Sequence, residues 1–209
     1  MSEARLSETI MIETVVLAQE LNLALSEVIE KARESLVRIH SNGSGVGAGS
    51  IWHPSGLIVT NAHVVGNRPV KVTLPDGSTH PARVLASDTS KDLAALSLEV
   101  EGLPAIELGD SSNLMPGHLV LALGHPLGIT GAVASGVVIG LGANLPGVPN
   151  PGREWLAVGL SLRPGHSGGP LVDARGRLVG INTMMAGPQV GLAVPVHVVK
   201  QFLRQELGS

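Results

Sequence analysis

The spacing of apolar residues divides the chain into a helical start, a long series of short strands and a helical end. Between residues 8 and 36, apolar side chains recur every three or four positions without Gly or Pro, which predicts an amphipathic helix. A helical period returns from Val196 to Leu207. Between these helices, short runs rich in Val, Leu and Ile recur about every ten residues, separated by turn signals such as Asp76-Gly77. We place the strands near residues 47–52, 57–61, 69–74, 81–86, 93–98, 118–124, 132–141, 155–160, 178–183 and 190–194.

Many short strands with Gly-rich turns indicate an all-β fold built as a sandwich or as barrels. The stretch from Glu107 to Pro116, which contains Gly109-Asp110-Ser111-Ser112, is the expected connection between two halves. We therefore expect an N-terminal helical segment over residues 1–33 and one domain over residues 34–209 that is split near residues 107–116.

Composition narrows the class of protein. The 209 residues include 27 Gly and no Cys, aromatic residues make up 1%, and the formal net charge is -3. The scarcity of aromatic side chains argues against a platform that stacks bases or sugars. The negative charge argues against a nucleic-acid partner, which requires neutralisation of phosphates. The absence of Cys excludes disulfides, cysteine nucleophiles and thiolate metal sites.

The sequence predicts no membrane span. Residues 111–152 contain no Lys, Arg, Asp or Glu, but their most apolar part covers only residues 131–143 and is interrupted by Gly. A spanning helix needs ~20 apolar residues. The first residues lack the basic start and unbroken apolar run of a signal peptide, so this start fits a cytoplasmic protein or one whose leader was removed.

Three segments bring together side chains that suit acyl transfer. In the first a strand runs into His63, in the second Asp92 opens an apolar strand, and in the third Ser167 lies among glycines. Taken singly, His63 could be a core or turn histidine, Asp92 a cap and Ser167 a turn residue. Together they supply a nucleophile, a base, an acid that orients the base, and backbone N–H donors for an oxyanion. The order His, Asp, Ser is that of the chymotrypsin-like arrangement, whereas α/β-hydrolases and subtilisins use other orders.

At these motifs the sequence resembles the trypsin-like serine proteases and, within them, the HtrA (Deg) family. The likeness runs from about Leu25 to Phe202. Its specific segments are Val28–Ala32, Ser35–Ile39, Thr60–Val65, Asp92–Ala94, Leu108–Ser111, Gly124–Gly128, Gly165–Pro170, Leu178–Thr183 and Gly191–Pro195. The resemblance implies two six-stranded β-barrels with an N-terminal and a C-terminal helix and an active site between the barrels.

The resemblance also implies a role for each site residue. His63 and Asp92 come from the first barrel and Ser167 from the second. Ser167 attacks a peptide carbonyl, His63 accepts its proton and Asp92 orients the imidazole. The backbone N–H groups of Gly165 and Ser167 form the oxyanion hole.

Several residues depart from the family pattern or compete with it. Asp88 is a rival acid, but the Asp-Leu-Ala motif favours Asp92. His166 stands where the family usually has Asn, and we assign it no catalytic role. Family trimers commonly rely on N-terminal aromatic residues, and none precedes Trp52, so a homo-oligomer is expected only by analogy. We expect a protease domain without a PDZ domain, which family analogy would place outside the cytoplasm.

The expected substrate pocket is apolar. No acidic residue lies between Leu156 and Asp173, so the loop before Ser167 lacks the carboxylate that trypsin uses to bind basic side chains. The resemblance places Leu162, Ile181 and Leu192 near the pocket. We predict cleavage after small aliphatic residues such as Val, Ala or Leu.

The predicted function is a serine endopeptidase that acts on unfolded or damaged proteins in protein quality control. We expect no cofactor and no metal, because serine chemistry needs neither and the eight His residues lack the spacing of zinc sites. The alternative is a binding or holdase module with a resting or degenerate protease site. An esterase shares the chemistry, but its nucleophile lies on an elbow between a strand and a helix, which this sequence does not predict.

Overall fold

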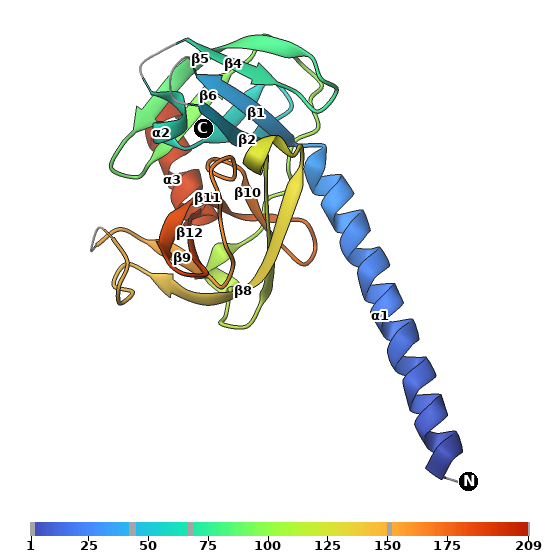
Figure 1. Ribbon diagram of the computed structural model, residues 1–209. Coiled ribbons are helices and arrows are strands. Elements are labelled where there is room, and N and C mark those ends of the chain that lie inside the picture. Colours follow the sequence, from blue (N-terminus) through green and yellow to red (C-terminus); the bar gives the residue numbers. More distant parts are fainter. Residues whose placement is uncertain (1–2, 42–44, 67–68, 150–151, 209) are drawn as a thin grey trace.

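The computed structural model describes residues 3–41, 45–66, 69–149 and 152–208. Within these ranges the chain forms two closed antiparallel barrels of six strands each, which lie one above the other in Figure 1. The expected all-β fold with two six-stranded barrels is confirmed.

The first barrel follows a long N-terminal helix, α1 (Glu3–Arg33). Its strands are β1 (Leu36–Ser41), β2 (Gly45–His53), β3 (Leu57–Thr60), β4 (Val70–Thr73), β5 (Thr79–Asp88) and β6 (Leu93–Ser97). They close in the order β1-β2-β3-β6-β5-β4. A single helical turn, α2 (Ala62–Val65), follows β3.

Residues 98–118 connect the barrels and include residues 107–116, where the sequence predicts the split. They contain a 3-10 turn, η1 (Ser111–Asn113). The second barrel has the strand order β10-β11-β12-β9-β8-β7. Its elements are β7 (Leu119–Gly124), a 3-10 turn η2 (Pro126–Gly128), β8 (Ala132–Gly142), β9 (Trp155–Val158), β10 (Pro170–Asp173), β11 (Leu178–Gly187) and β12 (Val190–Pro195). The terminal helix α3 (Val196–Leu207) runs back to the first barrel (Figure 1).

The structure corrects the expected secondary structure at two places. The helix predicted over residues 8–36 ends at Arg33, and Leu36 already pairs with Ser50 in the β1–β2 ladder. Strands β1 and β10 were absent from the prediction. β1 continues the apolar spacing of the helix before it, and β10 is a four-residue strand that begins at Pro170 directly after the glycine-rich loop.

Three apolar clusters account for the core. One is confined to the first barrel and includes Ile39 and Ile58, and another is confined to the second barrel and includes Val158 and Leu171. The third joins both barrels to α3, whose Phe202 is fully buried. Since apolar burial contributes about 25 cal/mol per Å², this shared cluster fixes the two barrels against each other and thereby fixes how their facing residues meet.

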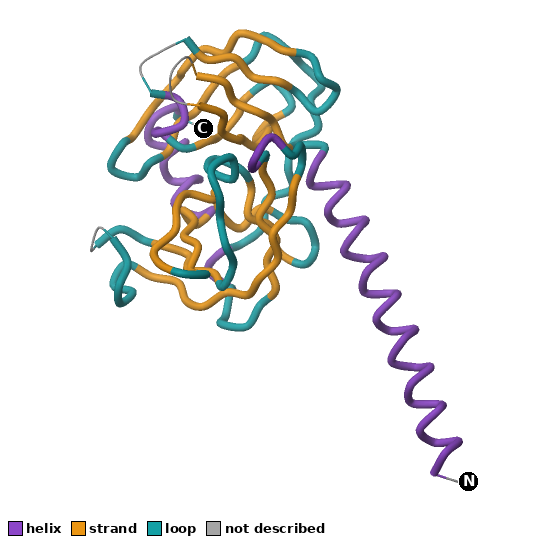
Figure 2. The backbone as a smooth tube through the Cα atoms, viewed as in Figure 1, coloured by secondary structure: helices purple, strands orange, loops and turns teal. Residues whose placement is uncertain are grey.

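The uncharged stretch that could be mistaken for a membrane span is part of the second barrel. Residues 132–142 form β8, which pairs with β7 and β9 (Figure 2). None of the helices in the described ranges combines the length and the apolarity needed to cross a membrane.

Candidate active site

The pairing of β3 with β6 brings His63 and Asp92 together. Thr60, the last residue of β3, lies opposite Ala94 near the start of β6. Because the strands are antiparallel, the residues after Thr60 and those before Ala94 emerge at the same end of the barrel. His63 on α2 and Asp92 just before β6 therefore become neighbours although 29 positions separate them.

Two carboxylate contacts fix the orientation of the His63 ring. Its Nδ1 lies 2.8 Å from Oδ2 and 3.0 Å from Oδ1 of Asp92, and the His63 backbone N–H donates to Oδ1 at 3.0 Å. The Asp92 side chain is 10% exposed and the His63 side chain 48%. Because an ionised carboxylate only accepts hydrogen bonds, Nδ1 of His63 carries the ring hydrogen and donates it to Asp92. Nε2, on the exposed side, is then free to accept a proton.

The backbone at Asp92 is held in an unusual conformation from both sides. Its φ is +50°, in the left-handed region that side chains disfavour. Nδ2 of the fully buried Asn61 donates to the Asp92 carbonyl at 2.9 Å. Nη2 of Arg153, from the second barrel, donates to the carbonyl of Lys91 at 2.6 Å. These bonds stabilise a strained backbone of the kind that is found at functional sites.

The loop that carries Ser167 requires glycine at two positions. At Gly165, where φ is +104°, a Cβ would lie 2.6 Å from the carbonyl oxygen of His125. At Gly168, where φ is +83°, a Cβ would lie 2.1 Å from Oγ1 of Thr60 in the first barrel. The glycines thus allow the loop to approach the first barrel closely, and the Ala48 backbone N–H donates to the Ser167 carbonyl at 2.9 Å.

The hydroxyl of Ser167 is turned toward a backbone carbonyl. Its Oγ donates to the carbonyl of Thr183 at 3.0 Å. In the described part of the chain, Ser167 and His63 share no hydrogen bond. Asn61 also donates from Nδ2 to Oγ1 of Thr183 at 3.2 Å. The same residue therefore contacts Asp92 and the segment whose carbonyl holds the Ser167 hydroxyl.

Two backbone donors lie at Ser167, the candidate nucleophile. Within the described ranges, the N–H groups of Gly165 and Ser167 donate to no protein acceptor, whereas the N–H of His166 between them donates to the Arg163 carbonyl at 2.9 Å. The Gly165 carbonyl accepts from the His125 N–H at 2.8 Å. This alternation leaves two N–H groups for a developing oxyanion, as an oxyanion hole requires.

Two buried histidines lie at this loop, His166 within it and His125 beside it. His166 accepts at Nδ1 from the Arg163 N–H at 3.1 Å, and burial lowers its pKa from the usual value. Burial, followed by the charge of Arg38, lowers the pKa of His125 to about 4. Both side chains are therefore neutral and buried at the loop. The sequence motif gave no indication that His125 would lie there. Nowhere in the described ranges do three or more His, Asp or Glu residues gather into a group that could hold a metal ion.

Asp88, the rival acid, is occupied by other partners. It accepts from Nζ of Lys91 at 2.5 Å and from Oγ of Ser90 at 2.6 Å. Burial by itself would raise the pKa of this carboxyl, but the hydrogen bonds from Lys91 and Ser90 lower it well below the usual range. The carboxylate that contacts His63 is that of Asp92.

The structure separates the three residues expected at the substrate pocket. Leu162 belongs to the cluster inside the second barrel, whereas Ile181 and Leu192 are fully buried in the cluster between the barrels. Successive side chains of a strand point to opposite faces. On β12, Leu192 and its neighbour Gly191 therefore face opposite sides. Gly191 is the residue that faces Leu162, because a Cβ added to Gly191 would lie 3.2 Å from the Leu162 side chain.

Met185 is a neighbour of Leu162 that sequence reasoning missed. Its sulfur lies 3.0 Å from the Leu162 backbone nitrogen, and its side chain packs against the cluster that contains Leu162. The adjacent Met184 packs against the cluster between the barrels. The alternation along β11 was the signal that could have identified Met185.

A two-barrel fold with this constellation where the barrels meet defines a class of peptidase domains. Residues 47–181 match the model of the trypsin-like peptidase domain, and the chain belongs to this family. HhoB of Synechocystis sp. is 39% identical over 161 residues, which cover 75% of this chain and 39% of HhoB. The mitochondrial serine protease HTRA2 of Drosophila pseudoobscura pseudoobscura is 40% identical over 170 residues, which cover 79% of this chain and 39% of HTRA2.

Solved structures show the same likeness. The HtrA-type protease AlgW with a tripeptide has a TM-score of 0.81 and 30% identity, over 88% of this chain and 64% of AlgW. The structure of AlgW with a decapeptide has a TM-score of 0.80 and 25% identity. These relatives confirm the expected resemblance to HtrA-type proteases. The chain spans about two fifths of the length of the curated relatives it matches.

Proposed function

We propose that this chain is a serine endopeptidase domain that uses His63, Asp92 and Ser167. The observation that supports this most strongly is the contact of 2.8 Å between Nδ1 of His63 and the largely buried carboxylate of Asp92, which leaves Nε2 free at the cleft. The nucleophile loop adds two backbone donors without a protein acceptor, those of Gly165 and Ser167.

The reaction begins with a rotation of the Ser167 side chain. Oγ leaves the Thr183 carbonyl and donates to Nε2 of His63. As Oγ bonds to the carbonyl carbon of the peptide, the proton moves to Nε2 and the carbonyl oxygen becomes an oxyanion held by the N–H groups of Gly165 and Ser167. His63 then gives the proton to the leaving amine. Water then attacks the acyl-enzyme while His63 accepts its proton. His63 returns a proton to Oγ of Ser167 as the ester bond breaks, which restores the Ser167 hydroxyl and releases the acid.

The proposed substrates are unfolded or damaged polypeptides. The solved HtrA-type relatives contain a tripeptide and a decapeptide, which supports a polypeptide as the substrate class. We propose that the substrate pocket lies before Ser167 beside Leu162, and that it is apolar because Leu162 contacts Met185 and faces Gly191. We propose that it accepts small aliphatic side chains.

The test is labelling with a fluorophosphonate together with cleavage of casein. We expect a label on Ser167, and no cleavage by Ser167→Ala. Asp92→Asn should lower kcat by roughly 10⁴-fold, because the imidazole then adopts the wrong tautomer. Cleavage by Ser167→Ala at the rate of the unchanged protein would contradict the proposal.

A holdase is the second candidate, and the bond between Ser167 Oγ and the Thr183 carbonyl favours it because the nucleophile is at rest in this conformation. In that case neither labelling nor cleavage occurs, while the chain still suppresses aggregation of an unfolded client. Suppression that is unchanged in Ser167→Ala, in a chain that never labels, would establish the holdase.

A further inference from the structure

Helix α1 projects away from the barrels and leaves large apolar side chains in solvent (Figure 1). Its last turns pack on the core through Leu25, Val28, Ile29 and Ala32. Before them, the exposed fractions are 46% for Val16, 66% for Leu17 and 67% for Leu23. A helix with so much exposed apolar surface needs a partner, because most helical stability in proteins comes from packing.

The charges in the middle of this helix have one sign. Between Arg5 and Lys31 the only charged residues are acidic: Glu8, Glu13, Glu20, Glu27 and Glu30. Three of them share a face with apolar residues, because Glu13, Val16, Glu20, Leu23 and Glu27 follow one another at spacings of three and four. We call this face, which is exposed throughout, the acidic stripe.

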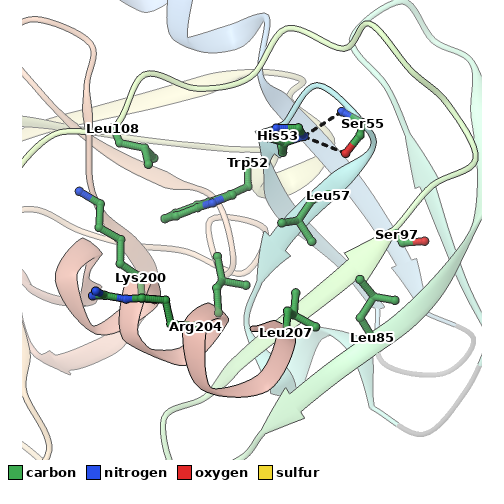
Figure 3. A pocket seen from close by; sticks show the side chains of 11 residues that line it. Trp52, His53, Ser55, Leu57, Leu85, Ser97, Leu108, Lys200, Arg204 and Leu207 are labelled. Atoms are coloured by element: carbon green, nitrogen blue, oxygen red, sulfur yellow. Dashed lines mark hydrogen bonds between the residues drawn. The ribbon is translucent and has the colours of Figure 1, made fainter. Parts of the chain in front are cut away.

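A groove of about 680 Å³ lies between the first barrel and α3, away from the catalytic residues. Figure 3 shows Trp52, Leu57 and Leu85 of the barrel facing Leu207 of α3, with Lys200 and Arg204 at the side of the groove. Leu85, which lines the groove, is 36% exposed. Neither Lys200 nor Arg204 has a carboxylate within salt-bridge distance in the described ranges.

We propose that the acidic stripe of one copy docks in this groove of a second copy. Val16 and Leu23 enter the apolar part between Trp52 and Leu207, and Glu20 lies beside Lys200 and Arg204. The complementarity is both apolar and electrostatic, since an acidic amphipathic helix meets an apolar groove whose charges are basic. It is the helix-in-groove mode of recognition.

The occupant is a second copy because the helix cannot fold back on its own chain. Residues 3–33 form one continuous helix without Gly or Pro, so no hinge lies between the acidic stripe and the packed end. A membrane surface is a poor partner, since helices that lie on anionic bilayers carry Lys and Arg on their polar face. The contact joins different surfaces of the two copies, so it builds a ring if it closes.

Cross-linking tests the contact directly, because the chain has no Cys. All chains carry Ser167→Ala to prevent self-cleavage. A tagged Leu23→Cys chain is mixed with an untagged Leu85→Cys chain under mild oxidation, and we expect a disulfide between tagged and untagged chains. The matched control is Val84→Cys, because Val84 is 40% exposed and adjacent to Leu85 but does not line the groove. Equal cross-linking to Val84→Cys, or cross-linking of Leu23→Cys only with itself, would overturn the proposal, the latter in favour of pairing between two α1 helices.

A charge swap measured by sedimentation equilibrium provides the second test. Glu20→Arg and Arg204→Glu should each weaken self-association about tenfold, as expected when one partner of an interfacial charge pair is reversed. The two changes combined in one chain should restore it. Lys71→Glu, a reversal on β4 outside the groove, is the control. If Arg204→Glu has no larger effect than Lys71→Glu, or the combination restores nothing, the groove is not the docking site.

Discussion

Arg153 of the second barrel donates a hydrogen bond of 2.6 Å to the backbone carbonyl of Lys91, the residue before Asp92, the proposed catalytic acid of the first barrel. Its guanidinium also lies over the Trp155 ring, 3.9 Å from the centroid. Burial lowers the pKa of Arg153, while the charges of Asp92 and Asp88 oppose this shift and keep the cation stable. One side chain therefore connects Trp155 of the second barrel to the strained backbone at Asp92.

We expect Arg153→Met to lower kcat/KM for a peptide substrate by about 10–100-fold, the size of effect that follows a small displacement of a catalytic group. The displacement arises because the Lys91 carbonyl loses its donor and Asp92 can relax from its φ of +50°. Arg153→Lys keeps the charge, so its kcat/KM should lie between that of the unchanged protein and that of Arg153→Met. The exposed Arg175→Met is the control. Unchanged kcat/KM in Arg153→Met across pH 5–9 would show that the contact does not position Asp92.

Gly168→Ala should abolish cleavage and lower the free energy of unfolding by more than about 2 kcal/mol, because the new methyl group meets Thr60 and the backbone has a positive φ. Gly77→Ala is a matched control, since its φ is +88° but nothing lies within 4 Å of its Cβ position. That variant should lose only about 1 kcal/mol and remain active. Urea unfolding and casein cleavage measure both effects. Similar losses in the two variants would mean that backbone strain, and not the close approach of the barrels, is decisive at Gly168.

Met185→Ala should widen the preference of the substrate pocket toward larger side chains such as Phe. The sulfur of Met185 lies 3.0 Å from the backbone nitrogen of Leu162, so removing the thioether opens space next to Leu162. Met184→Ala is the control, because Met184 is adjacent on β11 but packs against the cluster between the barrels. Mass spectrometry of casein digests measures the residue before each cleaved bond. A shift caused by Met184→Ala alone would place the pocket on the other face of β11.

Stability should fall as the pH decreases from about 6.5 to about 4. His125 titrates near pH 4 in the folded state and near 6.5 when unfolded, so in this interval the unfolded chain binds more protons than the folded chain. The sign of this difference makes the free energy of unfolding decrease with falling pH, by about 3 kcal/mol for a shift of this size. Burial lowers the pKa of His166 as well, which adds to the effect.

Urea unfolding at a series of pH values measures this dependence. His125→Asn and His166→Asn should each reduce the slope, whereas a change at the exposed His118 should leave it as it is. A slope that persists in a chain with both substitutions would assign the acid sensitivity to other groups.

Much of the fold was predictable because the short strands carry a local signal. Alternating or continuous apolar runs between Gly-rich turns predicted ten of the strands near their observed positions. β1 and β10 lacked such a signal, because the apolar spacing of α1 continues into β1 and because β10 begins at Pro170 directly after the glycine-rich loop. Closure into two barrels came from the resemblance, since strand pairing depends on residues distant in the sequence.

The residues of the candidate site were predictable where the chemistry requires a particular residue type. They were less predictable where the position of a side chain depends on how distant segments pack together. His63, Asp92, Ser167 and the glycines were identifiable from their motifs. The contacts of Arg153 with Lys91 and of Met185 with Leu162 were not, because each joins segments whose separation in space depends on the register of several strands. Ile181 and Leu192 illustrate the same point, since the face of a strand to which a side chain points is reversed by a shift of one residue.

The sequence by itself determined the all-β class, the candidate nucleophile, base and acid, and the absence of cysteine chemistry. These follow from local patterns and from the intrinsic chemistry of side chains. Only the tertiary structure decided that the Ser167 hydroxyl rests on the Thr183 carbonyl, that Arg153 of one barrel holds the backbone next to Asp92 of the other, and that α1 leaves its apolar surface unpacked. Each of these depends on how the barrels and the helix meet, and that arrangement is fixed by the apolar cluster between them, to which residues from both barrels and both long helices contribute.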